Sequence, residues 1–338
     1  MTSTVSVAMC TFNGSRFLSA QLQSIAAQRR LPDELIICDD ASSDGSDVIA
    51  MDFARQAPFP VRVVRNPQNV GVAHNFQQAI SVCCSSIIAL ADQDDIWYRH
   101  KLERIESAFL KSPAIVAAFS DADLIDSDSH SLGTRLWNSF LFTPREQKRF
   151  VNGGTLNVLV KHPVVTGATM AFRAELRSML LPIPASQLHD SWMSFLLAAC
   201  GPFAPISEPL IQYRSHRRQQ VGPGRADLRA RFEQARITGP RFYLREIERF
   251  HLLAERLQRH ASRFPFADRA LHEIDRKISH REHRACLPRS GMARIPKVVR
   301  EVLNGGYWRY SEGWQSIAKD MAGLHVDESF NKHLKVNQ

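Results

Sequence analysis

The chain has 338 residues, of which 44% are hydrophobic, and a formal net charge of +9. This length suits one large domain with an appendage or two domains, and the hydrophobic content is ordinary for a globular protein. The sequence has no run of the roughly 18 apolar residues that a membrane-spanning helix needs, and no basic and apolar leader at its start. We therefore expect a cytoplasmic protein.

The positive charge is unevenly distributed. Residues 1–222 carry 20 basic and 20 acidic side chains, so the whole excess lies in the remaining 23 basic and 14 acidic ones. Such asymmetry favours an acidic surface as partner, either a membrane or a nucleic acid. Because no nucleic-acid-binding motif accompanies the charge, we expect no nucleic-acid partner. Two interpretations stay open: peripheral contact with the inner face of the membrane, and a solvated helical face without a specific role.

The first 125 residues alternate between strand and helix patterns. Helical spacing occurs at 16–27, from the capping segment 43–46 to about 55, at 72–82 and at 98–110. Short apolar runs that predict strands occur at 5–10, 34–38, 61–64, 86–91 and 114–119. This alternation predicts an α/β, Rossmann-like fold, a mainly parallel sheet with helices on both faces.

After residue 128 the alternation becomes irregular. Residues 129–163 are mixed, and later patterns predict a strand at 164–172, a helix at 191–200 and a strand at 209–214. Gly222-Pro223-Gly224 is the predicted domain boundary. We expect a domain at 1–222, with halves at about 1–125 and 126–222, and a basic helical region at 223–338.

Asp92-Gln93-Asp94-Asp95 directly follows the predicted strand at 86–91. Crowded carboxylates repel one another unless a cation compensates them, and hard oxygen ligands suit Mg²⁺ or Mn²⁺ with substrate phosphates completing the shell. Open α/β sheets also bind ligands outside the carboxyl ends of their strands. Taken alone, the motif leaves a solvated acidic turn as an equal alternative.

Two further polar segments end at the same predicted edge. Cys10-Thr11-Phe12-Asn13-Gly14 follows the first strand, and a segment containing Asp40 follows the second. A carboxylate there could accept a hydrogen bond from a pyrimidine N–H, and Phe12 could stack on the base. Helix capping by Asp40 or Ser43 is the alternative.

The order of these segments closely resembles the family 2 inverting glycosyltransferases of the GT-A fold, within them the rhamnosyltransferase-like branch. The resemblance covers about residues 4–222, and the segment 310–320 is similar to tails seen in that branch. The segments that carry it are 10–14, 39–45, 69–71 with 75–76, 92–97, 166–170, 189–192 and 213–216.

The resemblance implies roles for single residues. Asp190 would be the catalytic base, although capping of the helix that follows it is the alternative from the residues alone. Arg214 and His216 would close over the diphosphate, and Gly167 and Trp192 would line the acceptor site, with a place in the core equally open for Trp192. The metal ligands would be Asp94, Asp92 and His216. The nucleotide would be bound by Cys10, Thr11, Phe12, Asn13, Asp40, Gly71, Asn75 and Asp92.

The implied reaction is metal-dependent transfer of a sugar, L-rhamnose from dTDP-rhamnose, onto a glycan or a polyprenyl-linked glycan. Membrane contact through the basic region, above all through Gly306–Tyr310, would bring such an enzyme to its acceptor. The alternatives are a UDP-hexose as donor and a nucleotide-sugar-binding protein without turnover. A nucleotidyltransferase is disfavoured, because Thr11-Phe12-Asn13-Gly14 lacks a Gly-rich basic phosphate loop.

The chain departs from the family pattern at two places. Relatives often have Lys near the position of His74, which puts a phosphate or base contact in doubt. Relatives also commonly have paired Asn where this chain has Arg218 and Gln219, which puts donor-sugar choice in doubt.

Overall fold

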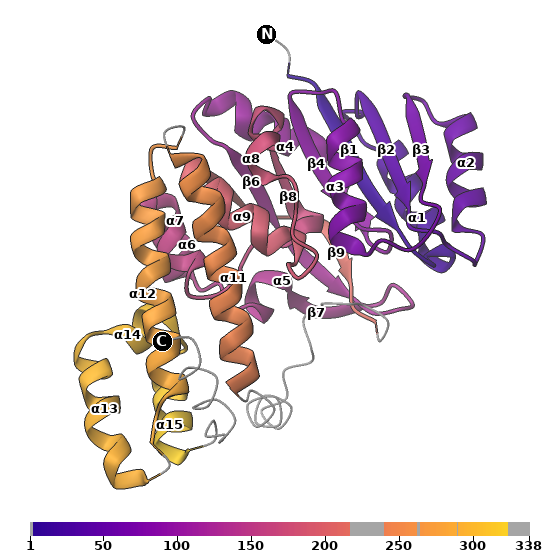
Figure 1. Cartoon of the computed structure of the whole chain (residues 1–338). Coiled ribbons are helices and arrows are strands. Elements are labelled where there is room, and N and C mark those ends of the chain that lie inside the picture. Colours follow the sequence, from indigo (N-terminus) through magenta and orange to yellow (C-terminus); the bar gives the residue numbers. More distant parts are fainter. Residues whose placement is uncertain (1–2, 217–239, 262–263, 289, 324–338) are drawn as a thin grey trace. The chain divides into compact units, whose positions relative to one another are not determined.

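The computed structural model of the chain (Figure 1) describes residues 3–216, 240–261, 264–288 and 290–323. The chain separates into two compact units. The first comprises residues 1–155 and 164–224, and the second comprises 156–163 and 225–338. The predicted boundary at Gly222-Pro223-Gly224, and the departures at Arg218 and Gln219, lie outside the described residues.

The described part of the first unit contains one nine-stranded sheet in the order β3-β2-β1-β4-β8-β6-β9-β5, with β7 paired to β6. Its strands are β1 (Val5–Thr11), β2 (Glu34–Asp39), β3 (Val61–Arg65), β4 (Ile87–Ala91), β5 (Ile96–Trp97), β6 (Ala117–Ile125), β7 (Ser131–Arg135), β8 (Met170–Arg173) and β9 (Phe203–Arg214).

Strands β1 to β4 form a parallel half-sheet whose carboxyl ends are aligned. Thr11 lies opposite Asp39, and Met9 lies opposite Ala91. Because side chains alternate between the two faces of a strand, Val5, Val7 and Met9 all point to the same side. The residues that follow β1, β2 and β4 therefore meet at one edge of the sheet, as the α/β prediction required.

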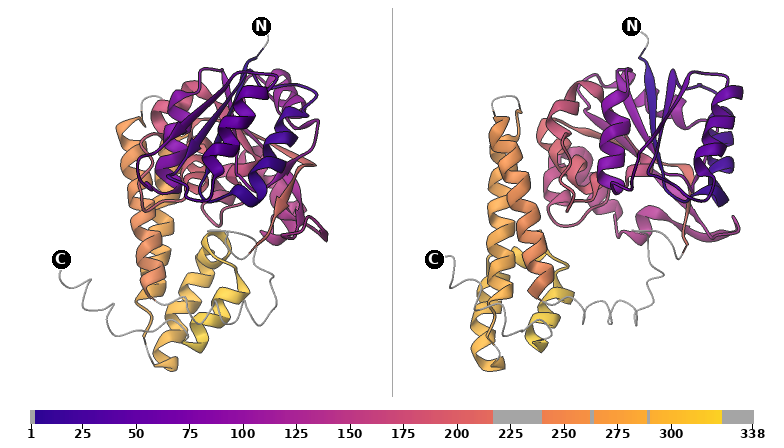
Figure 2. Two further views of the ribbon diagram at one scale, coloured as in Figure 1. Left: turned by 90° about the vertical axis from the view of Figure 1, so that its right-hand side faces the viewer. Right: turned by 45° about the vertical axis from the view of Figure 1, so that its right-hand side comes forward.

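Helices cover both faces of this half-sheet, and Figure 2 shows it sandwiched between them. Buried residues of α1 (Ser15–Ala26), α2 (Ser46–Gln56) and α4 (Lys101–Lys111) join the core cluster that contains Val5, Val7 and Met9. Helix α3 (Val72–Val82) packs against β1 and β2 and buries Phe76 and Ile80. The fold is therefore α/β with helices on both faces.

The other half of the sheet is mixed, where the sequence predicted mainly parallel pairing. Strand β8 pairs antiparallel with β4 and β6, and β6 pairs parallel with β9. The predicted strand at 164–172 is shortened to β8, because residues 167–169 form a 3₁₀ turn. Strand β6 extends to Ile125 through Ser120, Asp121 and Asp123, and Asp121 accepts hydrogen bonds from the backbone N–H groups of Ala122 and Trp137.

Short helices connect these later strands. They are α5 (Leu136–Ser139), α6 (Pro144–Arg149), α7 (Thr155–Leu159), α8 (Arg177–Leu180) and α9 (His189–Cys200). Helix α9 is almost entirely buried, which accounts for its nearly continuous apolar sequence.

The second unit is helical in its described part. Apart from α7, of which all but Thr155 belongs to this unit, its helices are α11 (Pro240–Arg259), α12 (Ala267–Ala285), α13 (Gly291–Leu303), α14 (Gly306–Tyr310) and α15 (Trp314–Ala322). Helices α11 and α12 lie side by side (Figure 2), with Phe250, Leu253 and Ile274 among their buried residues. Within the described ranges, we find no helix with the length and apolar character that a membrane span requires.

Candidate functional site

The acidic motif lies where β4 ends. All five residues of β4 are buried, and Asp92 is the first residue after the strand. The loop is then held against the end of β9. The backbone N–H of Arg214 donates to Asp95 Oδ1 (3.0 Å), and Arg214 Nε donates to the carbonyl oxygen of Asp94 (2.7 Å).

Four carboxylates act together on the buried phenol of Tyr213, which precedes Arg214 at the end of β9. Burial is the first cause that raises the pKa of Tyr213 well above its usual value, and nearby negative charge adds to it. The carboxylates that contribute are those of Asp95, Asp92, Asp94 and Asp190. Asp190 lies about 95 positions beyond the other three in sequence, so the fold itself concentrates this negative charge.

The crowding perturbs both Asp92 and Asp95. Burial, followed by the charges of Asp94 and Asp190, raises the pKa of Asp92 to about 7. Burial, followed by the charges of Asp94 and Asp92, raises the pKa of Asp95 well above its usual value, and Asp95 Oδ2 has no hydrogen-bond partner among the described residues. A site with this much uncompensated negative charge favours a cation.

Lys101 partly compensates the cluster, a role that the sequence analysis missed. It is fully buried at the start of α4, its Nζ donates to the carbonyl oxygen of Ala168 (2.7 Å), and it lies 3.6 Å from the ring centroid of Trp97. Burial lowers the pKa of Lys101 to about 7, against the opposing charges of Asp95 and Asp92. A lysine at a helix start gives no sequence signal for such a place, because surface lysines are common there.

Asp94 and His216 are the residues of the predicted metal set that touch each other. His216 Nε2 lies 2.7 Å from Asp94 Oδ2, and both side chains are mostly buried. Within the described ranges, no three or more His, Cys, Asp or Glu side chains are grouped tightly enough to hold a metal by themselves. One carboxylate and one imidazole fit a Mg²⁺ or Mn²⁺ ion whose remaining ligands are water and substrate oxygens.

Asp190 lies in the first turn of α9, and the N-cap position of that helix is Leu188. The capping alternative is therefore wrong for Asp190, although a negative charge in the first turn is favourable for the helix. The side chain is half-buried, and Asp190 Oδ1 accepts from the N–H of Ser191 (2.6 Å). Its influence on Asp92 places it at the same cluster.

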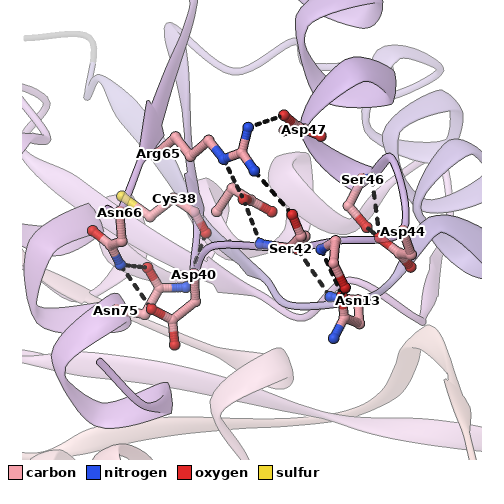
Figure 3. Close-up of polar contacts among 12 residues, drawn as sticks. Asn13, Cys38, Asp40, Ser42, Asp44, Ser46, Asp47, Arg65, Asn66 and Asn75 are labelled. Carbon is pink, nitrogen blue, oxygen red and sulfur yellow. Dashed lines mark hydrogen bonds and ion pairs between the residues drawn. The ribbon is translucent and has the colours of Figure 1, made fainter. Parts of the chain in front are cut away.

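The predicted nucleotide residues around Asp40 form a buried network (Figure 3). Asp40 Oδ1 accepts from Asn66 Nδ2 (2.9 Å) and from the N–H of Val70 (2.8 Å), and Asp40 Oδ2 accepts from the N–H of Gly71 (2.9 Å). Asn75 accepts from Asn66 and donates to the carbonyl oxygen of Cys38. Asp40 thus fixes the loop that ends at Gly71, and Oδ2 keeps acceptor capacity for a base N–H.

Gln93 joins the loop after β1 to the acidic motif. Gln93 Oε1 accepts from Thr11 Oγ1 and from the N–H of Phe12, both at 2.8 Å. A Cβ atom at Gly14 would lie 2.1 Å from the same oxygen, so a larger residue there would displace the Gln93 side chain. Phe12 is 43% exposed on this loop, a place open to a stacking base.

Other residues of the first loop support its shape. Asn13 has a positive φ of 48°, its N–H donates to Ser42 Oγ (2.9 Å), and its Oδ1 accepts from the N–H of Ser43 (2.9 Å). Cys10 is buried in β1, and burial raises the pKa of its thiol well above its usual value. Cys10 and Asn13 therefore support the conformation of the loop.

Two predicted contacts do not fit the structure. Arg214 is 2% exposed, and its guanidinium donates to the carbonyl oxygens of Asp94, Asp126 and Ser127, so it joins two loops instead of reaching for a phosphate. Trp192 is buried in α9 with its Nε1 donating to the carbonyl oxygen of Leu180 (2.8 Å), which is the core alternative.

Gly167 packs on His189, the neighbour of Asp190. A Cβ atom at Gly167 would lie 2.5 Å from His189 Nε2, and the His189 ring stacks on Phe76 with centroids 4.0 Å apart. Both are buried, and burial lowers the pKa of His189. Gly167 therefore leaves room for the His189 ring, and His189 precedes Asp190 at the start of α9.

This sheet order and site edge define a GT-A fold. Among solved structures, residues 1–349 of S. aureus TarS in complex with UDP-GlcNAc are similar, with a TM-score of 0.58, 13% identity, and coverage of 99% of this chain and 92% of that one. At this identity the likeness shows the fold. Residues 6–177, just over half of the chain, match the family described as Glycosyl transferase family 2. The chain belongs to glycosyl transferase family 2, which confirms the predicted family.

Two curated relatives extend the match. The chain is 25% identical over 215 residues to an uncharacterized glycosyltransferase of Nostoc sp., covering 63% of this chain and 65% of that protein. It is 23% identical over 256 residues to the dTDP-rhamnosyl transferase RfbG of Shigella flexneri, covering 71% of this chain and 82% of that protein. The chain spans less than two thirds of the length of the first curated relatives that it matches.

Proposed function

We propose that the chain is a metal-dependent inverting glycosyltransferase that moves a sugar from a nucleotide diphosphate to a hydroxyl of a glycan or lipid-linked glycan. The observation that carries this proposal is the cluster of Asp92, Asp94, Asp95 and Asp190 around Tyr213. Buried like charges at the carboxyl edge of an α/β sheet favour a cation and a phosphate-bearing ligand. Membership of family 2 supports the same reaction class.

Asp190 would act as the base. Its carboxylate takes the proton of the acceptor hydroxyl as that oxygen attacks the anomeric carbon, and the bond from this carbon to the diphosphate breaks with its electron pair staying on the diphosphate. A single displacement inverts the anomeric centre and needs no covalent enzyme intermediate. A divalent ion held by Asp94 and His216, with Asp92 beside them, would neutralise the charge that builds on the leaving group.

For the donor, we propose dTDP-rhamnose. This donor is supported by the relative named as a dTDP-rhamnosyl transferase, which gives the longer of the two reported alignments. The exposed Phe12 would stack on the base, and Asp40 Oδ2 would accept from its ring N–H. The competing donor is a UDP-hexose, which suits the same pyrimidine contacts and which the UDP-GlcNAc complex of TarS favours.

The first experiment compares donors by thermal shift, using dTDP-rhamnose and UDP-hexoses with and without Mn²⁺. A bound ligand raises the melting temperature in proportion to the logarithm of its concentration over its Kd. Metal-dependent stabilisation by dTDP-rhamnose is the expected result. Stronger stabilisation by a UDP-hexose would change the donor but not the reaction class, and no shift with any of them would contradict the nucleotide site.

The second experiment tests the base with Asp190→Asn. We expect transfer to a panel of polyprenyl-linked glycans to fall by roughly 10²–10⁴-fold, with donor binding unchanged in the thermal-shift assay. Glu103→Gln is the matched control, an equally small change in the first turn of α4 at an exposed position. Transfer by Asp190→Asn at a rate near that of the parent would rule out Asp190 as the base.

A further inference from the structure

Helix α13 of the second unit has three distinct faces. Val298 packs with Leu287 and Tyr307 in a small core cluster. Arg294 points the same way and donates to the carbonyl oxygens of Pro288 (2.9 Å) and Met321 (2.8 Å). The helix is thus attached firmly to α14 and α15, against which it packs (Figure 1). This attachment leaves the other two faces of α13 open.

The second face is apolar and exposed. Met292 and Leu303 are 83% and 82% exposed, and Ile295 and Val299 between them are 45% and 48% exposed. At 3.6 residues per turn these four positions fall within an arc of roughly 80°. Four exposed aliphatic side chains in one stripe are unusual for a surface that meets only water.

The third face, next to the apolar stripe, is basic. Lys297 and Arg300 are exposed there. The acid that α13 carries, Glu301, points elsewhere and contacts His280 (2.5 Å). The exposed charges of α13 are therefore all positive.

A pair of tryptophans follows within the next eleven residues. Trp308 on α14 and Trp314 on α15 are 42% and 70% exposed, and their ring centroids are 5.1 Å apart in an edge-to-face arrangement. Arg309, between them in sequence, is also exposed. Tryptophan with arginine or lysine is typical of residues that lie at the boundary between lipid and water.

We propose that α13 and the Trp308–Trp314 pair form a docking face for an anionic lipid bilayer. An exposed apolar stripe beside cations matches a membrane surface, where acyl chains lie under negative headgroups, and a helix of this kind lies in the plane of the interface. A protein partner or a second copy of this chain could also cover an apolar stripe. The all-positive exposed charge of α13 favours the lipid, and a second copy would bring like charges together. The proposal is independent of the donor and of the reaction.

Flotation of the purified full chain with vesicles tests the docking face. We expect the chain to float with vesicles of phosphatidylcholine containing phosphatidylglycerol, to float less as salt is raised, and to stay unbound with phosphatidylcholine alone. The double variant Met292→Ser/Leu303→Ser should bind the vesicles at least about tenfold more weakly than the parent. Lys297→Gln/Arg300→Gln should lose the dependence on phosphatidylglycerol.

The control is Met51→Ser/Leu110→Ser, which removes two exposed aliphatic side chains from the first unit. It should bind vesicles like the parent, and circular dichroism should confirm that each variant is folded. Equal binding by the parent and Met292→Ser/Leu303→Ser would overturn the proposal. A parent that ignores the vesicles but forms dimers, which the same double variant abolishes, would overturn it in favour of a second copy.

Discussion

Asp92 in the first unit and Asp320 in the second differ in how the charge of the carboxylate is compensated. In the first unit, burial and the charges of Asp94 and Asp190 outweigh the charge of Lys101 and raise the pKa of Asp92. In the second, both oxygens of Asp320 accept from the Arg284 guanidinium, at 2.7 and 2.9 Å, and Tyr307 donates to it at 2.6 Å. Buried charges are stable only when they are compensated. The acidic cluster of the first unit is thus compensated only in part, by Lys101, whereas Asp320 of the second unit is paired within the chain.

Among the variants that test this difference, we expect the largest effect from Asp92→Asn. We expect transfer to fall by roughly 10³-fold, about 4 kcal/mol in activation free energy, because the variant weakens the electrostatic stabilisation of the leaving group. The ligand-free protein should melt at the same temperature or higher, because one of several like charges is gone. Thermal melts and transfer assays on the same preparation measure both. A clear loss of stability without loss of transfer would reverse the interpretation of this cluster.

Asp320→Asn should do the opposite. It leaves the buried Arg284 guanidinium without its carboxylate, so we expect the second unit to lose about 3–4 kcal/mol of unfolding free energy. Hydrogen exchange of α12 and α15 under native conditions localises the loss. Asp275→Asn, at an exposed position of α12, is the control and should change exchange little. Unchanged protection in Asp320→Asn would show that the pair contributes little to folding.

Local sequence patterns predicted part of the fold and of the site. Strands β1 to β4 were predictable, because each is a short apolar run between helices with clear periodicity. The alternation of strands and helices also predicted that the ends of β1, β2 and β4, after which Asp40 and Asp92 lie, meet at one edge. Motifs report residues that are chemically conspicuous, and they did not indicate that Arg214 is buried. For Trp192 the sequence left a core position open, and the structure shows that position.

What the sequence hid depends on distant partners. The Lys101 side chain is buried where its Nζ donates to the carbonyl oxygen of Ala168 and lies over the ring of Trp97. Strand β6 contains the buried Asp121, whose carboxylate accepts from the N–H groups of Ala122 and Trp137. Such compensation is a property of tertiary structure. It cannot be recognised from the local pattern, which in both places is that of a polar surface.

A smaller effect is expected where packing, rather than charge, supports the first site. In Gly14→Ala the new methyl group would displace the Gln93 side chain, which holds Thr11 and Phe12. A side-chain end moves easily, so stability should change little, while donor binding weakens about three- to tenfold with the lost hydrogen bonds. Isothermal titration measures this. Gly291→Ala, with no atom within 4 Å of the new methyl group, should bind like the parent.

The smallest effect tests the self-compensated unit by pH. Glu246 forms an ion pair with Arg281 (2.5 Å), and Lys277 and Arg249 add positive charge. Burial raises the pKa of Glu246, but these cations outweigh it and lower the pKa below its usual 4.5. A lowered pKa in the folded state means that the stabilisation is fully present above the unfolded value and is lost as pH falls through the folded one.

Glu246→Gln resembles the protonated side chain at every pH. We therefore expect the variant to be about 1–2 kcal/mol less stable than the parent at pH 7, and the two stability curves to converge as pH falls below 4.5. Urea titrations between pH 3.5 and 7, with hydrogen exchange to localise the change to α11 and α12, measure the difference. Glu248→Gln is the control, because Glu248 lies two residues further along α11 at an exposed position. Its stability should equal that of the parent at every pH. A Glu246→Gln curve that stays parallel to the parent's at low pH would mean that Glu246 contributes by packing and not by its charge, which would remove the basis for calling this unit electrostatically self-sufficient.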